Sequence, residues 1–397
     1  MIPKANNVPS DSRAVLALSI VSAIAWLTPV HLPFLVGEYV EYYGKSDSVA
    51  GWLASAEIGS LALAAAVTAV LLGRISPKQP LRIGLVLSAL GAAATVLSSS
   101  FLVLVLSRLV LGIGLGLIAA ASNAIPAGKE NSTRIYAVMI VAMGVMGAVL
   151  LVLTPIALRA FGRSGAFLCE LLLIVVALPF ARWLPEGPVR IAPKSPGMKA
   201  HGVRISSICG IAALFLVYVG RGAVWSHAER VGVLLHLSDR SLGIFFGVSA
   251  LSGLAGAVIA LLVGLRAGQI VPLVIGTILQ MLAAIFIYVI VGKNFLVGSL
   301  QIFNFAGLFL TPYVMGLLAE LDSTGRVAGF GGSAINFGLA IGPGLASVFL
   351  VRFGYQMVGY SASAEFLVAV ILLLPVVFSQ LPRQEDARHQ TASGPSS

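Results

Sequence analysis

The chain has 397 residues, of which 58% are hydrophobic and only 10% are charged, and its mean hydropathy is +1.00. Such values exclude an ordinary soluble protein, in which about a quarter of the residues carry charge, and they predict an all-helical membrane protein. The formal net charge of +10 follows from membrane orientation, as the positions of the basic residues below indicate, so we expect no nucleic-acid partner.

Twelve apolar runs of bilayer-crossing length follow one another along the chain. The first begins at Ala14 and is too long for the core of a signal peptide, so we expect it to remain as an uncleaved span. The predicted spans cover residues 14–36, 49–73, 81–99, 102–127, 134–158, 164–184, 205–226, 241–264, 270–292, 294–319, 325–350 and 360–381. Residues 186–204, between the sixth and seventh spans, contain three prolines and five basic side chains, which indicates a linker.

The two sets of six spans predict two six-helix bundles. Residues 51–74 align with residues 243–266 without a gap, and both segments end in an arginine. We therefore expect halves related by pseudo-twofold symmetry, an architecture in which transporters bind solute between the halves near mid-membrane. The predicted organisation is an N-terminal bundle over residues 1–185, a cytoplasmic linker over 186–204, a C-terminal bundle over 205–382 and a disordered cytoplasmic tail over 383–397.

The distribution of Lys and Arg among the predicted loops sets the orientation in the membrane. With the N-terminus in the cytoplasm, 16 of the 25 Lys and Arg residues fall on the cytoplasmic side, seven fall outside and two lie within spans. This bias predicts a multi-pass protein of the cytoplasmic (inner) membrane with both termini in the cytoplasm. We expect it to work as a monomer.

Six ionisable side chains lie inside the predicted spans at similar depths, roughly 10 Å from one face of the bilayer at a helix rise of about 1.5 Å per residue. They are His31, Glu57, Arg108, Glu170, Arg221 and Glu365. Because charge in hydrocarbon is costly, each needs a partner or a watery cavity, and structural pairing is one explanation. Glu57, Arg108 and His31 are also predicted to couple transport to protons, since an arginine that moves relative to a carboxyl switches its protonation. The sequence leaves open whether Glu170 and Glu365 are functional or structural.

Arg221 is the strongest candidate for contact with a solute. Two glycines flank it, and Trp225 follows one helical turn later on the same face, which suits an anionic or aromatic solute. Interfacial anchoring of both side chains is the alternative interpretation. The further residues predicted to bind solute are Trp26, Tyr218, Gln301 and Asn304.

The fourth span contains SRLVLGIGLG, in which an arginine is followed after four residues by a series of glycines. This pattern resembles the span 4 motif of the major facilitator superfamily, and GLAIGPGLA on the eleventh span is similar to the family's Gly-Pro packing motif. The matching residues are Arg108, Gly112, Gly114, Gly116, Gly338, Gly342 and Pro343. The resemblance implies the family's fold of two six-helix bundles, a role for the arginine in proton coupling, and glycines that let neighbouring helices pack closely.

Two departures from the family pattern narrow these expectations. The loop after the second span, LGRISPKQPLR, lacks the family's aspartate and its Gly-Arg-Arg/Lys cluster, which weakens the expectation of a cytoplasmic gate relay. The fifth span lacks the Gly-Pro pair usual in drug/proton antiporters, which argues against a standard drug exporter.

Together these features predict a proton-coupled transporter of a small organic solute, such as an organic anion or an amphipathic compound, that works by alternating access. Its expected partners are the solute, protons and the lipid bilayer. Drug efflux by proton antiport is the first alternative, ahead of a membrane-embedded enzyme or a channel. Cys169 and Cys209 lie in apolar runs, and no spacing typical of metal or ATP binding occurs, so we expect no cofactor, metal or catalytic residue.

Overall fold

The computed structural model describes residues 12–72, 74–126, 132–184, 205–264, 268, 270–290, 292–321 and 326–378. The predicted linker over 186–204 and the predicted tail over 383–397 lie outside these residues. All regular secondary structure in the described ranges is helical, and twelve helical segments there are long and apolar enough to cross a bilayer, two of them made of two consecutive helices. The prediction of an all-helical membrane protein with twelve spans is confirmed.

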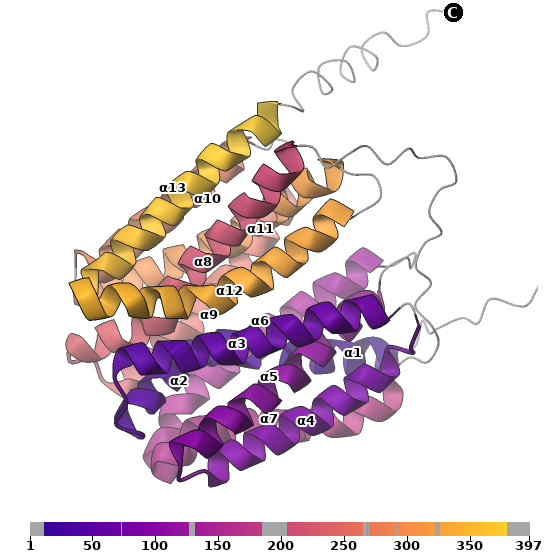
Figure 1. Ribbon diagram of the computed structural model, residues 1–397, viewed down its shortest axis with the longest axis vertical. Helices are drawn as coiled ribbons and strands as arrows, with labels where there is room; N and C mark the ends of the chain where they lie inside the picture. Colours follow the sequence, from indigo (N-terminus) through magenta and orange to yellow (C-terminus); the bar gives the residue numbers. More distant parts are fainter. Residues whose placement is uncertain are drawn as a thin grey trace, which may run out of the picture.

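The helices fall into two groups, which Figure 1 shows side by side. The N-terminal half contains α1 (Ser12–Ile24), α2 (Leu27–Glu41), α3 (Asp47–Leu71), α4 (Lys78–Leu97), α5 (Phe101–Ala124), α6 (Ser132–Phe161), η1 (Gly162–Ser164), α7 (Gly165–Ala177) and η2 (Leu178–Trp183). The C-terminal half contains α8 (Ile205–Leu234), α9 (Asp239–Val263), α10 (Ile270–Tyr288), α11 (Lys293–Leu321), α12 (Arg326–Phe353) and α13 (Gln356–Phe378).

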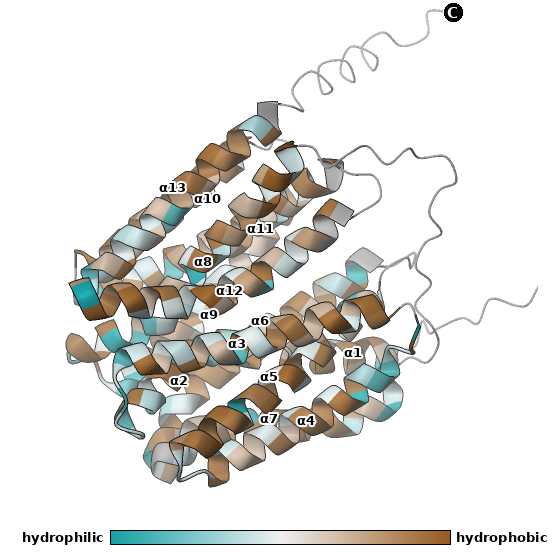
Figure 2. Ribbon diagram, viewed as in Figure 1, coloured by the Kyte–Doolittle hydropathy of each residue, from teal (hydrophilic) through white to brown (hydrophobic). Residues whose placement is uncertain are grey.

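The helices of both halves consist largely of apolar residues (Figure 2). Apolar side chains form the cores of both halves and are also exposed on the outer surface. Val70 is 80% exposed, Leu97 is 83% exposed and Ile205 is 78% exposed. Large apolar surfaces of this kind would drive a soluble protein to aggregate. In a lipid bilayer such surfaces are stable, because lipid tails are as apolar as the side chains themselves.

The first predicted span consists of two helices, α1 and α2, that meet at Ala25 and Trp26. The amides of these two residues donate to carbonyls three residues earlier, at 3.2 and 3.1 Å, and the α-helical pattern resumes at Val30. Pro29 explains the break, because its ring lacks an N–H and collides with the carbonyl four residues before it, that of Ala25. The break sets the direction of α2. This helix carries Thr28 and two further side chains of the site described below.

The seventh span extends further than the sequence indicated. The prediction ended it at residue 226, but α8 continues without interruption to Leu234. His227, Glu229 and Arg230 make residues 227–234 more polar than the predicted span before them. Arg230 in this last part of the helix bonds Glu41 and Asp47 of the other half of the molecule, as described below.

The two halves contact each other near the end of the molecule that carries the α2–α3 and α8–α9 connections, which we call the closed end. Helix α3 packs against α12, and α6 packs against α9. Trp225 Nε1 on α8 donates to the Val30 carbonyl on α2 at 3.2 Å, and Gly344 N on α12 donates to Ser55 Oγ on α3 at 2.6 Å. These contacts fix the relative position of the halves.

Candidate functional site

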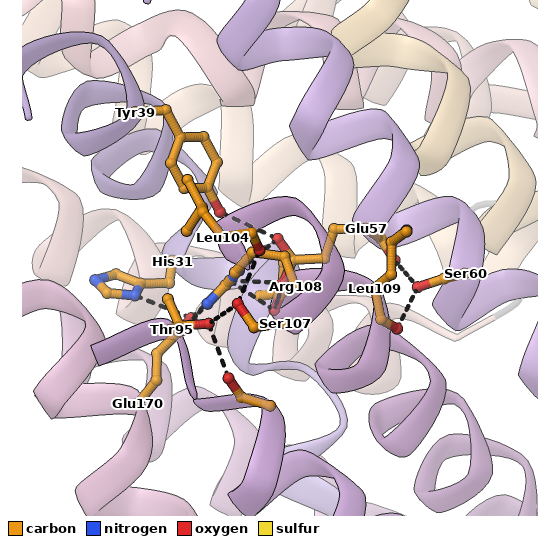
Figure 3. A network of polar contacts seen from close by, with 12 residues as sticks. His31, Tyr39, Glu57, Ser60, Thr95, Leu104, Ser107, Arg108, Leu109 and Glu170 are labelled. Atoms are coloured by element: carbon orange, nitrogen blue, oxygen red, sulfur yellow. Dashed lines mark hydrogen bonds and ion pairs between the residues drawn. The ribbon is translucent and has the colours of Figure 1, made fainter. Parts of the chain in front are cut away.

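An ionic network fills the core of the N-terminal half around Arg108 of α5 (Figure 3). Arg108 Nε donates to Glu57 Oε2 at 2.8 Å, and Arg108 Nη2 lies 2.6 Å from Glu57 Oε1. Arg108 Nη1 donates to Glu170 Oε2 on α7. One guanidinium thus holds two carboxylates, the first of them by two parallel contacts, which is the strong bidentate geometry of arginine.

Hydroxyl groups on α2 complete the surroundings of Glu57. Thr28 Oγ1 donates to Glu57 Oε1 at 2.7 Å, and Tyr39 OH donates to Glu57 Oε2 at 3.2 Å. Both oxygens of this buried carboxyl therefore have a neutral donor in addition to Arg108. Such donors stabilise the carboxylate without adding charge to the site.

His31 of α2 links the network to α6 and α7. Its Nδ1 lies 3.2 Å from Glu170 Oε1, and its Nε2 lies 2.8 Å from Thr154 Oγ1. Thr154 Oγ1 also lies 2.7 Å from the Leu150 carbonyl. When the Thr154 hydroxyl donates to that carbonyl, it must accept from His31 Nε2, and Nδ1 then faces the Glu170 oxygen. This second contact is favourable only if a proton lies between Nδ1 and the carboxyl.

The network holds two carboxyls but only one guanidinium among its buried groups. Glu57, Arg108 and His31 are 0% exposed and Glu170 is 1% exposed. Two carboxylates face one guanidinium, so the ionised set has one excess negative charge. Because an uncompensated charge in a low-dielectric site is strongly unfavourable, one additional proton on His31 or on a carboxyl would balance the site.

Arg221 of α8 occupies a different environment in the core of the C-terminal half. Its Nη1 donates to Gln280 Oε1 at 3.2 Å and to the Phe303 carbonyl at 3.3 Å, and its Nη2 donates to Asn304 Oδ1 at 3.3 Å. Its Cζ lies 5.2 Å from the ring centroid of Phe303 and 5.7 Å from that of Tyr218. Within the described residues Arg221 forms no ion pair, so neutral oxygens alone surround this guanidinium, which is 9% exposed.

The other predicted solute-binding residues separate into two groups. Tyr218 and Asn304 lie beside Arg221, and Tyr218 OH is 2.8 Å from Thr311 Oγ1. Gln301 does not join them, because its amide bonds Ser252 Oγ and the carbonyls of Phe245 and Val297 and so connects α11 to α9.

The two predicted tryptophans lie away from Arg221. Trp225 turns toward the N-terminal half, where its Nε1 donates to the Val30 carbonyl. Its indole packs edge-on against Phe246 of α9, in its own half, with ring centroids 5.2 Å apart. Trp26 lies at the junction of α1 and α2. Their roles in solute binding stay predictions.

Several residues around Arg108 and Arg221 could not be identified individually from the sequence. They are Thr28, Tyr39, Thr154 and Gln280, all neutral side chains in apolar helices. The two carboxyls whose role was left open behave differently from each other. Glu170 belongs to the Arg108 network, whereas Glu365 packs against Gly220 within the C-terminal half and its Oε2 has no hydrogen-bond partner among the described residues.

The glycines of both motifs lie where helix backbones meet. A Cβ at Gly114 would lie 2.6 Å from the Gly84 carbonyl of α4, and one at Gly116 would overlap the Leu61 carbonyl of α3. On α12, a Cβ at Gly338 would lie 2.6 Å from the Phe215 carbonyl of α8. Gly342, which precedes Pro343 on α12, also packs closely against the backbone of α8. These positions bring helix axes close together, as small residues do in membrane proteins.

Gly112 connects this packing to the ionic network. Its α-carbon faces Ser60 Oγ and the Glu57 carbonyl, and a Cβ would lie 2.5 Å from that carbonyl oxygen. We expect Gly112→Ala to push α3 away from α5 and to lower the free energy of unfolding by about 1–3 kcal/mol. Reversible unfolding in mixed micelles measures the change. Gly298→Ala on α11 is the matched control, because no heavy atom lies within 4 Å of its Cβ position. Equal effects of the two substitutions would contradict the packing argument.

Comparison with known proteins places the chain in a structural context. A model of the Major Facilitator Superfamily matches residues 15–323. No curated protein sequence matches the chain. Similar solved structures include the human organic anion transporter MFSD10 (TETRAN), which is 19% identical with a TM-score of 0.65 and matches over 92% of this chain and 100% of that chain.

Two further solved structures share the fold at low identity. A D-xylose-proton symporter is 17% identical over 91% of this chain and 97% of that chain, with a TM-score of 0.70. A POT family transporter in complex with 5-aminolevulinic acid is 14% identical over 94% and 96% of the two chains, also with a TM-score of 0.70. At these identities the likeness concerns the fold.

Proposed function

Because the chain belongs to the major facilitator superfamily of secondary transporters, we propose that it carries a small organic anion across the membrane by alternating access, with the proton as coupling ion. The family consists of transporters, so the chain is a multi-pass membrane transporter and not an enzyme. The environment of Arg221 is the observation that supports an anion as the solute.

The two buried arginines differ in charge balance. Arg108 binds two carboxylates, whereas the partners of Arg221 within the described ranges are the neutral oxygens of Gln280, Asn304 and the Phe303 backbone. A guanidinium in a low-dielectric environment is costly without an anionic partner. A solute carboxylate would supply that partner, and Gln280 Nε2, which is buried and has no partner among the described residues, is a second donor for it. The same positive charge disfavours cationic drugs as solutes.

The Arg108 network supports the proton as the coupling ion. Because the network has two carboxylates for one guanidinium, it needs one more proton while it is buried from water. The contact between His31 Nδ1 and Glu170 Oε1 is a place for that proton. Movement of α2 or α7 relative to α5 would change the distance of either carboxyl from Arg108 and with it the affinity for the proton. We therefore assign proton coupling to Glu57, Arg108 and His31, with Glu170 as their partner.

The proposed orientation is that predicted from the basic residues, with both termini on the cytoplasmic side of the inner membrane and the protein active as a monomer. In this orientation the closed end faces away from the cytoplasm. The arrangement of the halves would then represent the state that is shut toward the outside.

Arg221→Gln tests the assignment of the anion. We expect this variant to bind a carboxylate solute about 10- to 100-fold more weakly, because a hydrogen bond to a charged group contributes about 1.5–3 kcal/mol. Binding of the corresponding neutral amide should change less than threefold. Thermal-shift titrations with pairs of aliphatic and aromatic acids and their amides measure both, with the exposed Arg352→Gln as control. Equal losses for acid and amide would refute an anionic solute at this position.

A further inference from the structure

A second set of charged groups lies at the closed end and joins the two halves directly. Arg230 of α8 donates from Nη1 to Glu41 Oε1 at 2.7 Å and from Nε to Asp47 Oδ1 at 3.2 Å. Both acids belong to the N-terminal half, one at the end of α2 and one at the start of α3. The side chain of Arg230 is 15% exposed and that of Glu41 is 58% exposed, so these ion pairs are within reach of water and each contributes little.

The neighbouring residue, Glu229, has a different environment. It is 7% exposed and lies against the backbone of α2, where a Cβ at Gly37 would be 2.8 Å from Glu229 Oε2. This oxygen has no hydrogen-bond partner among the described residues. The nearest cation is Arg230, whose Nη1 is 4.0 Å away and is already bonded to Glu41. Within the part of the chain that the structure describes, Glu229 is therefore a buried carboxyl without a cation of its own, at the contact between the halves.

The charges that act on Glu229 are mostly of its own sign. They are Glu38 and Glu41 of α2, Arg230 of α8 and Asp239 of α9, and Asp47 of α3 is bonded to Arg230. Tyr355 lies near Asp47, and because burial raises the pKa of its phenol, it stays neutral. Glu38 is itself 9% exposed. An ionised Glu229 would face three acids and share one guanidinium, with little access to water.

We propose that Glu229 is a proton-binding site that controls the contact between the two halves at the closed end. It holds a proton while the halves are packed together and releases it when they separate and water reaches the carboxyl. Ionisation within the closed contact is disfavoured by desolvation and by the surrounding acids. Low pH therefore favours the closed arrangement. Linkage of one proton changes the ratio of closed to open molecules by at most about tenfold per pH unit.

This site is separate from the Arg108 network and does not rest on the proposed solute. Glu229 lies between the halves at their closed end, whereas Arg108, Glu57 and Glu170 lie inside the N-terminal half. Its test therefore reads the distance between the halves and does not need transport. Failure of anion binding at Arg221 would leave the outcome unchanged.

Spin labels at Ser99 and Phe353, two exposed positions at the closed end on opposite halves, report that distance. The labelled protein carries alanine at Cys169 and Cys209 and is reconstituted into lipid, and pulsed electron paramagnetic resonance gives distance distributions between pH 5 and pH 9. We expect the closed distance to predominate at pH 5 and to lose population as the pH rises. The Glu229→Gln variant should keep the closed distance up to pH 9.

Glu365→Gln is the matched control, because it removes another buried carboxyl with an unpartnered oxygen, one that lies within the C-terminal half. The population with the closed distance should depend on pH in this variant as it does in the parent. A Glu229→Gln variant that follows the pH dependence of the parent, or a parent that shows no pH dependence, would overturn the proposal. If Glu229→Gln does not fold, Gly37→Ala keeps every titratable group and crowds the carboxyl. It should lower the closed population at pH 5, and an unchanged population would count against the site.

Discussion

Replacing Arg108 with alanine is expected to lower the free energy of unfolding by about 3–5 kcal/mol, because removal of one partner from a buried ionic network leaves the others uncompensated. In this protein the groups left behind would be Glu57 and Glu170, which are 0% and 1% exposed and face each other across the space vacated by the guanidinium. Their burial limits how far water can replace the lost donors. Reversible unfolding in mixed micelles measures the loss.

Two further variants separate this explanation from a general effect of shortening a side chain. Arg134→Ala removes an exposed arginine at the start of α6 and should change stability by less than about 0.5 kcal/mol. Combining Arg108→Ala with Glu57→Gln and Glu170→Gln should recover part of the loss, because neutral amides do not need the missing cation. A triple variant less stable than Arg108→Ala alone would contradict the charge argument.

Replacing Glu57 with glutamine is expected to abolish solute accumulation driven by a pH gradient while leaving exchange of solute across the membrane within about threefold of the parent. The amide cannot titrate, and Arg108 with Glu170 then forms a neutral pair. The N-terminal half would no longer need an additional proton. Counterflow of a labelled solute in liposomes measures exchange, and uptake under an imposed gradient measures coupling.

Glu365→Gln serves as the matched control for this experiment. It also removes a carboxyl from within a predicted span, but Glu365 contacts no member of the Arg108 network. Its accumulation should resemble that of the parent. Normal accumulation by Glu57→Gln would exclude this carboxyl from proton coupling, and loss of counterflow as well would indicate a folding defect.

The sequence was sufficient for the number of spans, because that number depends on properties of single helices. The common level of the buried charges in the membrane stays a prediction. Hydropathy predicts which segments cross a bilayer, and residue counts along each span give depth. The pairing of Arg108 with Glu57 could also be predicted, since opposite charges at one depth in hydrocarbon are expected to form an ion pair. The arginine–glycine pattern on the fourth span indicated the family, which the match over residues 15–323 confirms.

Other features depend on how helices rotate against one another, which hydropathy does not encode. Glu170 and Glu365 looked equivalent by depth, yet only Glu170 faces Arg108. Gln280 was missed because a neutral amide in an apolar helix is common as a packing contact. Gln301 was placed beside the solute path from its span alone, whereas its amide bonds α9.

The most direct test of proton-coupled anion transport uses liposomes that contain the purified protein and an imposed pH gradient. A permanently ionised sulfonate analogue of a carboxylate that binds should be used, because a weak acid crosses lipid in its neutral form and accumulates without any protein. We predict saturable movement of the sulfonate against its concentration gradient, which reverses direction when the pH gradient is reversed and is absent from protein-free liposomes. A sulfonate that reaches only equal concentrations on both sides, whatever the pH gradient, would contradict coupling to protons.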